Sequence, residues 1–181
     1  MTGTTDASPK VIATVEVGND PSEVAVSPLT GAAYVVSDGN HLGNLVTVIN
    51  GETNKVAAVI PDHVGSFDGP GGIAISPKTG TVYVANDISS TVSVISGKTS
   101  TVTASISFPD GNAGTAEVAV SPVTGSVYAN GVTNGGLTNN SLGALWVSGR
   151  RPRREGGRRN PSAFHGRAGR VGGVFRLDVR R

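Results

Sequence analysis

The sequence predicts an all-β fold assembled from repeated four-stranded sheets. The main observation is a Val/Ile-Ala-Val/Ile-Ser-Pro-x-Thr-Gly motif that occurs three times, at residues 24–31, 73–80 and 118–125. The prolines of successive copies are 49 and 45 residues apart. A period of this length, with short strands between turns, is typical of β-propeller blades. We therefore predict a partial β-propeller of about three four-stranded antiparallel blades over residues 10–149.

Each repeat contains β-rich runs bounded by Pro, Gly, Asn or Asp. The strands expected in the first repeat are 23–27, 32–37, 45–50 and 55–60, and those in the second are 72–76, 81–86, 91–96 and 101–107. The third repeat has strand signals at 117–121, 126–130 and 144–148 but none for a fourth strand. One more run, at residues 11–17, is predicted to be the last strand of a preceding blade.

The Ser-Pro-x-Thr-Gly segment predicts a tight turn between the first two strands of each repeat. Proline cannot donate to a strand ladder, and glycine supplies the positive φ that closes the turn. The serine of the motif is expected to make a structural hydrogen bond in each blade, at Ser27, Ser76 and Ser121. A tyrosine recurs in each second strand and is predicted to pack with its hydroxyl bonded, at Tyr34, Tyr83 and Tyr128.

Residues 74–86, followed by 91–95, resemble the YVTN-type β-propeller repeat family (YncE-like proteins). The segment Tyr83-Val84-Ala85-Asn86 stands where that family has its Tyr-Val-x-Asn signature, and residues 34–37 and 128–130 are looser copies. The resemblance implies a propeller, commonly of about seven blades, often outside the cytoplasm or on the cell surface. It also implies a binding role without a known reaction, and it supplies no shared catalytic residues.

The charge of the chain divides sharply at residue 150. Residues 1–149 contain four lysines, no arginine and eleven acids, for a net charge of −7, whereas residues 150–181 contain eleven arginines and two acids, for +9. There is no cysteine, so disulfides are excluded. No secretory signal is visible near the start, and no apolar stretch approaches the roughly 18 residues of a membrane-spanning helix.

Three explanations fit the arginine-rich segment at 150–181. The favoured one is frameshifted translation, because Arg, Gly and Pro dominate abruptly inside a blade and a one-base shift permits a further repeat motif. The second is a disordered tail, as is predicted also for residues 1–9. The third is a basic arm that binds nucleic acid, for which the aromatic side chains expected at single strands are few.

No catalytic, cofactor-binding or metal-ligating residue is assigned. His63 lies near Asp62 and Asp68, but zinc needs three or four ligands in register, and residues 62–69 lack the acid spacing of a calcium loop. His41 is interpreted in the same way, as a surface loop histidine. The glycine-rich run at 69–72 precedes a strand and not a helix, so it is no phosphate cradle. The polar loop at 134–141 is a place where binding could occur, without a legible ligand.

The predicted function is that of a non-enzymatic binding or scaffold module that holds a protein or glycan partner through propeller loops. One alternative is a propeller enzyme, lactonase-like or quinone-linked dehydrogenase-like, which would need convergent acids, histidines or metal ligands. The other is nucleic-acid binding through the arginine-rich tail. No cofactor and no membrane span are expected.

Three blades are fewer than the roughly four to eight of closed propellers. The chain could be a fragment of a longer propeller, or a lone arc of marginal stability. It could also associate with a second copy into a ring, with residues 11–17 completing the partner's third blade.

Overall fold

The computed structural model describes residues 9–39, 44–62, 67–107, 113–114, 117–133, 140–146 and 176–178. These residues form strands and turns, without a helix among them. The strands group into three sheets, which we name blade 1, blade 2 and blade 3 in chain order. The predicted all-β class with four-stranded antiparallel sheets is therefore confirmed.

Blades 1 and 2 are four-stranded antiparallel sheets whose strands follow chain order. Blade 1 contains β1 (Pro21–Val26), β2 (Ala33–Ser37), β3 (Leu45–Asn50) and β4 (Lys55–Pro61). Blade 2 contains β5 (Pro70–Ile75), β6 (Val82–Asn86), β7 (Thr91–Ser96) and β8 (Thr101–Ser107). The strands β3, β7 and β8 match the predicted bounds, and the other strands of these two blades differ by one or two residues at one or both ends.

Blade 3 has three antiparallel strands in chain order and two short additions. Its main strands are β10 (Val118–Val120), β11 (Val127–Thr133) and β12 (Asn140–Trp146). The two-residue strand β9 (Ala113–Gly114) pairs with the end of β11, and β13 (Arg176–Asp178) pairs in parallel with β12. The predicted strand at 144–148 thus starts earlier, at Asn140, while residues 147–148 lie outside the described residues.

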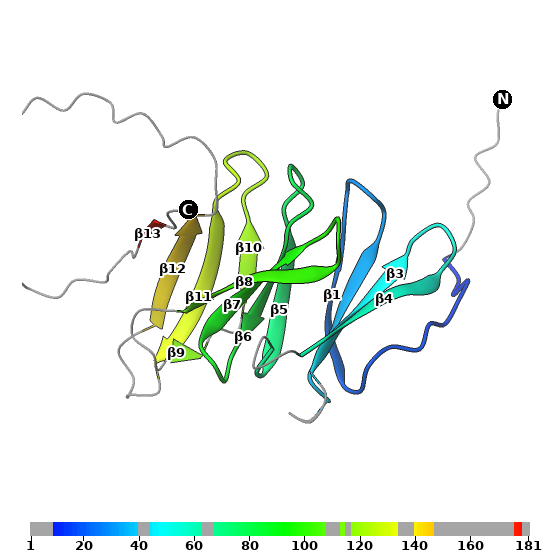
Figure 1. The fold of residues 1–181 in the computed structure, drawn as a ribbon, viewed down its shortest axis with the longest axis horizontal. Helices are drawn as coiled ribbons and strands as arrows, with labels where there is room; N and C mark the ends of the chain where they lie inside the picture. Colours follow the sequence, from blue (N-terminus) through cyan, green and yellow to red (C-terminus); the bar gives the residue numbers. More distant parts are fainter. Residues whose placement is uncertain are drawn as a thin grey trace, which may run out of the picture.

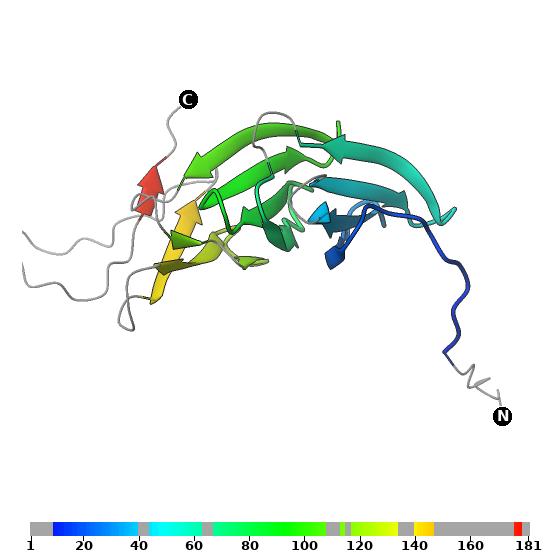
Figure 2. The same ribbon diagram turned by 90° about the horizontal axis from the view of Figure 1, so that it is seen from below.

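The three blades lie side by side, with their first strands adjacent. The strand β5 contacts β1 on one side and β10 on the other, as Figure 1 also shows. Seen from below in Figure 2, the sheets follow one another along an arc, with β4 and β8 on its outer side. This is the radial arrangement of propeller blades, in which each sheet covers a face of the next.

The turns between the first two strands of each blade share one geometry. The glycines Gly31, Gly80 and Gly125 have φ of 69°, 70° and 76°, which confirms the predicted left-handed position. In each turn the amide of this glycine donates to the carbonyl of the motif serine, at 2.8–2.9 Å. The hydroxyls of Ser76 and Ser121 also accept from an amide within the turn, as predicted for these serines.

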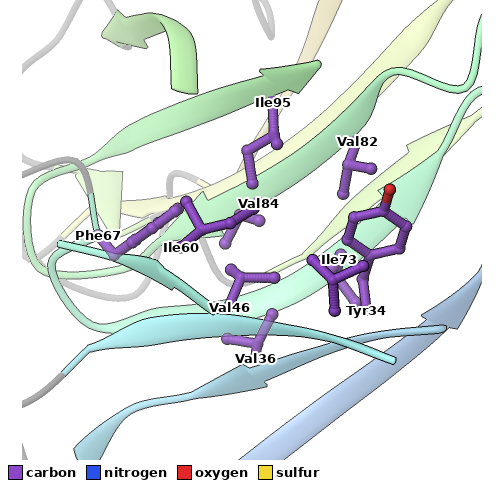
Figure 3. Close-up of a cluster of buried hydrophobic side chains, with 10 residues drawn as sticks. Tyr34, Val36, Val46, Ile60, Phe67, Ile73, Val82, Val84 and Ile95 are labelled. Carbon is purple, nitrogen blue, oxygen red and sulfur yellow. The ribbon is translucent and has the colours of Figure 1, made fainter. Parts of the chain in front are cut away.

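Two apolar cores lie between the blades. The first joins blade 1 to blade 2, and its members are Tyr34, Val36, Val46, Val48, Ile60, Phe67, Ile73, Val82, Val84 and Ile95 (Figure 3). The second joins blade 2 to blade 3, and its members are Tyr83, Ala85, Val92, Val94, Val118, Val127 and Ala129. Since strand side chains alternate between faces, β6 and β7 contribute to both cores, one from each face of blade 2.

The prediction of a strand at residues 11–17 is wrong, because these residues have no ladder partner. The run was predicted to be the outer strand of a preceding blade, but no sheet precedes blade 1 among the described residues, and blade 1 already has its own outer strand, β4. The segment instead passes over blade 1 at Gly18, where an added Cβ would lie 2.7 Å from Ser37 Cβ and 2.9 Å from Leu45 Cδ1.

The arginine-rich segment contributes β13 at the edge of blade 3. This strand pairs with Ala144–Trp146 of β12. The edge on which residues 11–17 of a second copy were expected to pair is therefore occupied at these three positions. The remaining residues of the tail, and the explanations offered for it, lie outside the described residues.

Candidate functional site

The blades carry different charges at the two ends of their strands. Pairing of Pro21 with Ser37 and of Leu45 with Pro61 places the starts of β1 and β3 and the ends of β2 and β4 together, and blade 2 repeats this arrangement. Six carboxylates flank these strand ends and define what we call the acidic end: Asp20, Asp38, Asp62, Asp68, Asp87 and Glu117. The opposite hairpin end has three described lysines, Lys55, Lys78 and Lys98, beside Glu52.

A repeated backbone hydrogen bond holds the loops of the acidic end. In blade 1 the amide of Asp38 donates to the carbonyl of Asp20 at 3.2 Å. In blade 2 the amide of Asp87 donates to the carbonyl of Gly69 at 2.8 Å. In blade 3 the amide of Asn130 donates to the carbonyl of Glu117 at 3.1 Å. Carboxylates on these loops are therefore presented from an ordered backbone in all three blades.

The entry into the first strand of blades 1 and 2 requires a left-handed residue. Asp20 has φ of 48° and Gly69 has φ of 62°, and each immediately precedes a proline. Asp is among the few residues with a side chain that tolerate this region. Blade 1 thus places a carboxylate at a position where blade 2 has none.

Asp62 and Phe67 anchor the connection between blades 1 and 2. The carboxylate of Asp62 accepts from the amide of Phe67 at 3.0 Å, and the amide of Asp62 donates to the carbonyl of Asn44 at 3.1 Å. The side-chain amide of Asn44 donates to the carbonyl of Phe67 at 2.6 Å, and the Phe67 ring is fully buried. Asp62 therefore has a structural partner, in agreement with its interpretation as a loop residue.

The acidic end can attract cations and basic groups. Asp20, Asp62, Asp87 and Glu117 are exposed, whereas Asp38 and Asp68 are half-buried. Charges of one sign gathered on one side of a protein raise the local concentration of oppositely charged partners. Within the described ranges, no three or more His, Asp or Glu side chains are grouped so that they could hold a metal ion. The described segments also contain no helix long and apolar enough to cross a membrane.

The repeated tyrosines connect neighbouring blades. The hydroxyl of Tyr34 in blade 1 donates to the carbonyl of Gly97 in blade 2 at 3.3 Å, and burial raises the pKa of Tyr34. Burial likewise raises the pKa of Tyr83, while a side-chain hydrogen bond with Thr81 opposes that rise. The predicted packing role holds for these two residues, which are 2% and 3% exposed, but Tyr128 is 40% exposed.

The other features weighed in the sequence fall in different places. His41, His63 and residues 134–139 lie outside the described residues, while Pro70, Gly71 and Gly72 belong to β5. The acidic end was missed by sequence reasoning. The available signal was that acids directly flank strands at the ends remote from the Ser-Pro-x-Thr-Gly turns.

No protein-family model matches this chain, and no curated protein matches it in sequence. Solved structures do match it. Hydrazine synthase of Kuenenia stuttgartiensis is 20% identical with a TM-score of 0.45, over 76% of this chain and 49% of that one. The β-propeller domain of Cps50 (Swd1) of Myceliophteria thermophila is 13% identical with a TM-score of 0.55, over 74% and 38%. The WD40 β-propeller domain of Doa1 is 16% identical with a TM-score of 0.47, over 62% and 33%.

This chain spans between a third and a half of the length of these structures. The match to the Cps50 domain concerns the fold alone, because identity is low. It agrees with the four-stranded antiparallel sheets and with the adjacent first strands β1, β5 and β10. The chain therefore has the fold of part of a β-propeller.

Proposed function

We propose that this chain is a non-enzymatic binding module of the YVTN repeat type whose acidic end binds a protein partner through a basic segment of that partner. The observation that carries the proposal is the separation of charge between the acidic end and the opposite hairpin end of the blades. Carboxylates from all three blades lie at one end, on loops held by the same backbone hydrogen bond, and lysines lie at the other. Complementary charge of this kind gives specificity and a fast association rate.

A protein partner suits this end better than a glycan. Sugar rings are usually recognised by exposed aromatic faces together with polar groups, and the described aromatic residue at this end, Phe67, is fully buried. A binding role also suits it better than catalysis. The carboxylates are distributed along the arc over three blades, whereas acid–base chemistry needs titratable groups that converge on one reacting atom.

Titration with a synthetic oligolysine peptide tests the proposal, with fluorescence anisotropy as the readout. The test variant combines Asp20→Asn, Asp87→Asn and Glu117→Gln, which removes one exposed carboxylate from each blade. The matched control is Glu52→Gln at the hairpin end. Because each exposed pair contributes up to about 1 kcal/mol, we expect the triple variant to bind roughly tenfold more weakly or worse, and wild type to weaken with salt.

The affinity of the Glu52→Gln control for the peptide is compared with that of the triple variant. Glu52→Gln should leave the affinity unchanged within about twofold. Equal affinity for wild type and triple variant, or an equal loss in the control, would contradict the assignment of binding to the acidic end.

A further inference from the structure

The free face of blade 1 repeats a face that is buried elsewhere in the molecule. Val24 occupies in blade 1 the position of Ile73 in blade 2 and Val118 in blade 3. Val24 is 61% exposed, whereas Ile73 and Val118 are each 8% exposed because the preceding blade covers them. No sheet precedes blade 1 among the described residues, so Val24 lacks the cover that Ile73 and Val118 have.

Cross-strand pairing identifies the side chains that share this face, which is exposed at β1 and β4 and covered at Thr47 of β3. Val24 pairs with Val35, Val35 with Thr47 and Thr47 with Val59, so the four side chains share one face. A second row on this face runs from Val26 through Ala33 and Ile49 to Val56. We call this surface the head face and define it by its exposed valines, Val24, Val26, Val56 and Val59.

Blade 3, the last blade along the arc, presents the complementary surface. In blades 1 and 2 the face bearing Tyr34 or Tyr83 is covered by the next blade, but Tyr128 in blade 3 is exposed. Ala119, which pairs with Tyr128, is exposed as well. At the adjacent hairpin, Lys78 of blade 2 donates to the carbonyl of Val123, while Val123 itself is 79% exposed. Tyr128, Ala119 and Val123 define the tail face.

The acceptor for Tyr128 is already formed on the head side. Tyr34 bonds the carbonyl of Gly97, a glycine packed so tightly that an added Cβ would lie 2.2 Å from the Gly80 carbonyl oxygen. Gly51 is the equivalent residue of blade 1, and an added Cβ there would lie 2.1 Å from the Gly31 carbonyl oxygen. The turn that receives a tyrosine in blade 2 thus has the same geometry in blade 1, where none of the described tyrosines reaches it.

We propose that the head face of one molecule packs on the tail face of a second copy of this chain, in the same register as the blades within the molecule. In this contact the Tyr128 hydroxyl donates to the Gly51 carbonyl of the second copy, and Val24 and Val26 of that copy pack beside Tyr128. We choose a second copy as the partner because the chain already forms this type of blade-to-blade interface twice internally. Each molecule has one head face and one tail face, which are the two surfaces that such an interface needs.

The interface is heterologous, since two different patches meet. Such interfaces either close into rings or extend as open chains. Two arcs would supply about six blades, within the range of closed propellers, so a dimer is the expected closed form. The segment ending at Gly18 lies against Ser37 and Leu45 on this face, and Thr47 beside them is 1% exposed, whereas Val24 and Val26 are each 61% exposed and remain accessible.

Mixing of two single-face variants tests the proposal, with sedimentation velocity on the full chain as the readout. The head variant is Val24→Glu with Val26→Glu, and the tail variant is Tyr128→Glu. All three side chains are exposed in the monomer, so circular dichroism and thermal melts should remain as in wild type. The control Ile88→Glu replaces an apolar residue that is 54% exposed and lies in the turn between β6 and β7, outside the residues that define the two faces.

The wild type and the control should gain mass with concentration, from 18.2 kDa toward a dimer. Each single-face variant alone should stay monomeric, with its dissociation constant raised at least about tenfold. Their mixture should recover a one-to-one complex, because one intact head and one intact tail remain. Wild-type chain that is monomeric at all concentrations would overturn the proposal. Association lost in the head variant but kept in the tail variant would overturn it too, since it would mean that head faces pair with each other.

Discussion

Blade 2 and the two terminal blades are built from the same repeat but differ in how much of it is covered. Both faces of blade 2 lie in an apolar core, so Tyr83 and Val84, on opposite faces of β6, are both buried. In blade 1 another blade covers the tyrosine face alone, while the segment ending at Gly18 covers only part of the opposite face. In blade 3 another blade covers only the face opposite Tyr128. The alternation along a strand therefore decides which side chains share a face, but a neighbouring blade decides whether that face is buried.

Replacing equivalent tyrosines by alanine should show the largest difference between covered and open faces. Tyr34→Ala removes a fully buried ring and its bond to Gly97, so the free energy of unfolding should fall by about 3–5 kcal/mol. Tyr128→Ala should cost less than about 1 kcal/mol in the dilute monomer. Urea titrations at low protein concentration measure both, and similar losses would mean that the two tyrosines have similar surroundings.

Two equivalent valines allow the same comparison for the opposite face. Val118→Ala leaves a cavity in the core between blades 2 and 3 and should destabilise the fold by about 2 kcal/mol. Val24→Ala should change the stability by less than about 0.5 kcal/mol, since the side chain is exposed. An effect of Val24→Ala as large as that of Val118→Ala, again in dilute solution, would show that the head face is covered within the monomer.

Replacing the hairpin glycine by alanine should destabilise the protein equally in blade 1 and in blade 3. Gly31 and Gly125 have positive φ, and no atom lies within 4 Å of an added Cβ at either one. Replacement by alanine therefore costs backbone strain alone, about 1–2 kcal/mol at each site. Thermal melts should show the same destabilisation for the two variants, and a clear difference would mean that the hairpins depend on their place in the arc.

Alkaline pH should slightly reduce the stability of the fold, because Tyr34 and Tyr83 are buried in their protonated form. Burial raises the pKa of Tyr34 and Tyr83 above the ordinary value of 10.0, so the unfolded chain loses these protons first. Their contribution to stability is intact below pH 10.0 and decreases as pH rises from there through the raised pKa values. Urea midpoints measured across this range should fall less in a Tyr34→Phe, Tyr83→Phe variant, and an equal fall would assign the effect to other groups.

Much of the fold could be predicted from local patterns. The strands β3, β7 and β8 were predicted with their observed bounds, since β-branched runs there are limited by Gly, Asn and Ser turns. The left-handed Gly31, Gly80 and Gly125 were predictable for the same reason, because a tight turn demands them. The segment 11–17 has an equally good strand pattern but pairs with no strand, because the described residues contain no preceding sheet for it to complete. A local pattern contains no information about the presence of that partner sheet.

The site was less predictable because its contacts are long-range. At the acidic end the bond from Asn44 to Phe67 spans 23 residues, and at the hairpin end the inter-blade bond from Tyr34 to Gly97 spans 63. The acidic end was visible only once the register of β1 with β2 and of β3 with β4 placed their flanking acids on one side. Charge in the sequence was apparent, but its separation between two ends follows from the topology.

Hydrogen exchange of the backbone amides tests the account most directly. It should be measured in dilute solution on the head variant Val24→Glu with Val26→Glu, so that association protects neither blade 1 nor blade 3. With both faces covered, β6 and β7 of blade 2 should exchange more slowly than the equivalent β2 and β3 of blade 1. Exchange of β2 and β3 that is as slow as that of β6 and β7 would contradict the claim that successive blades protect one another.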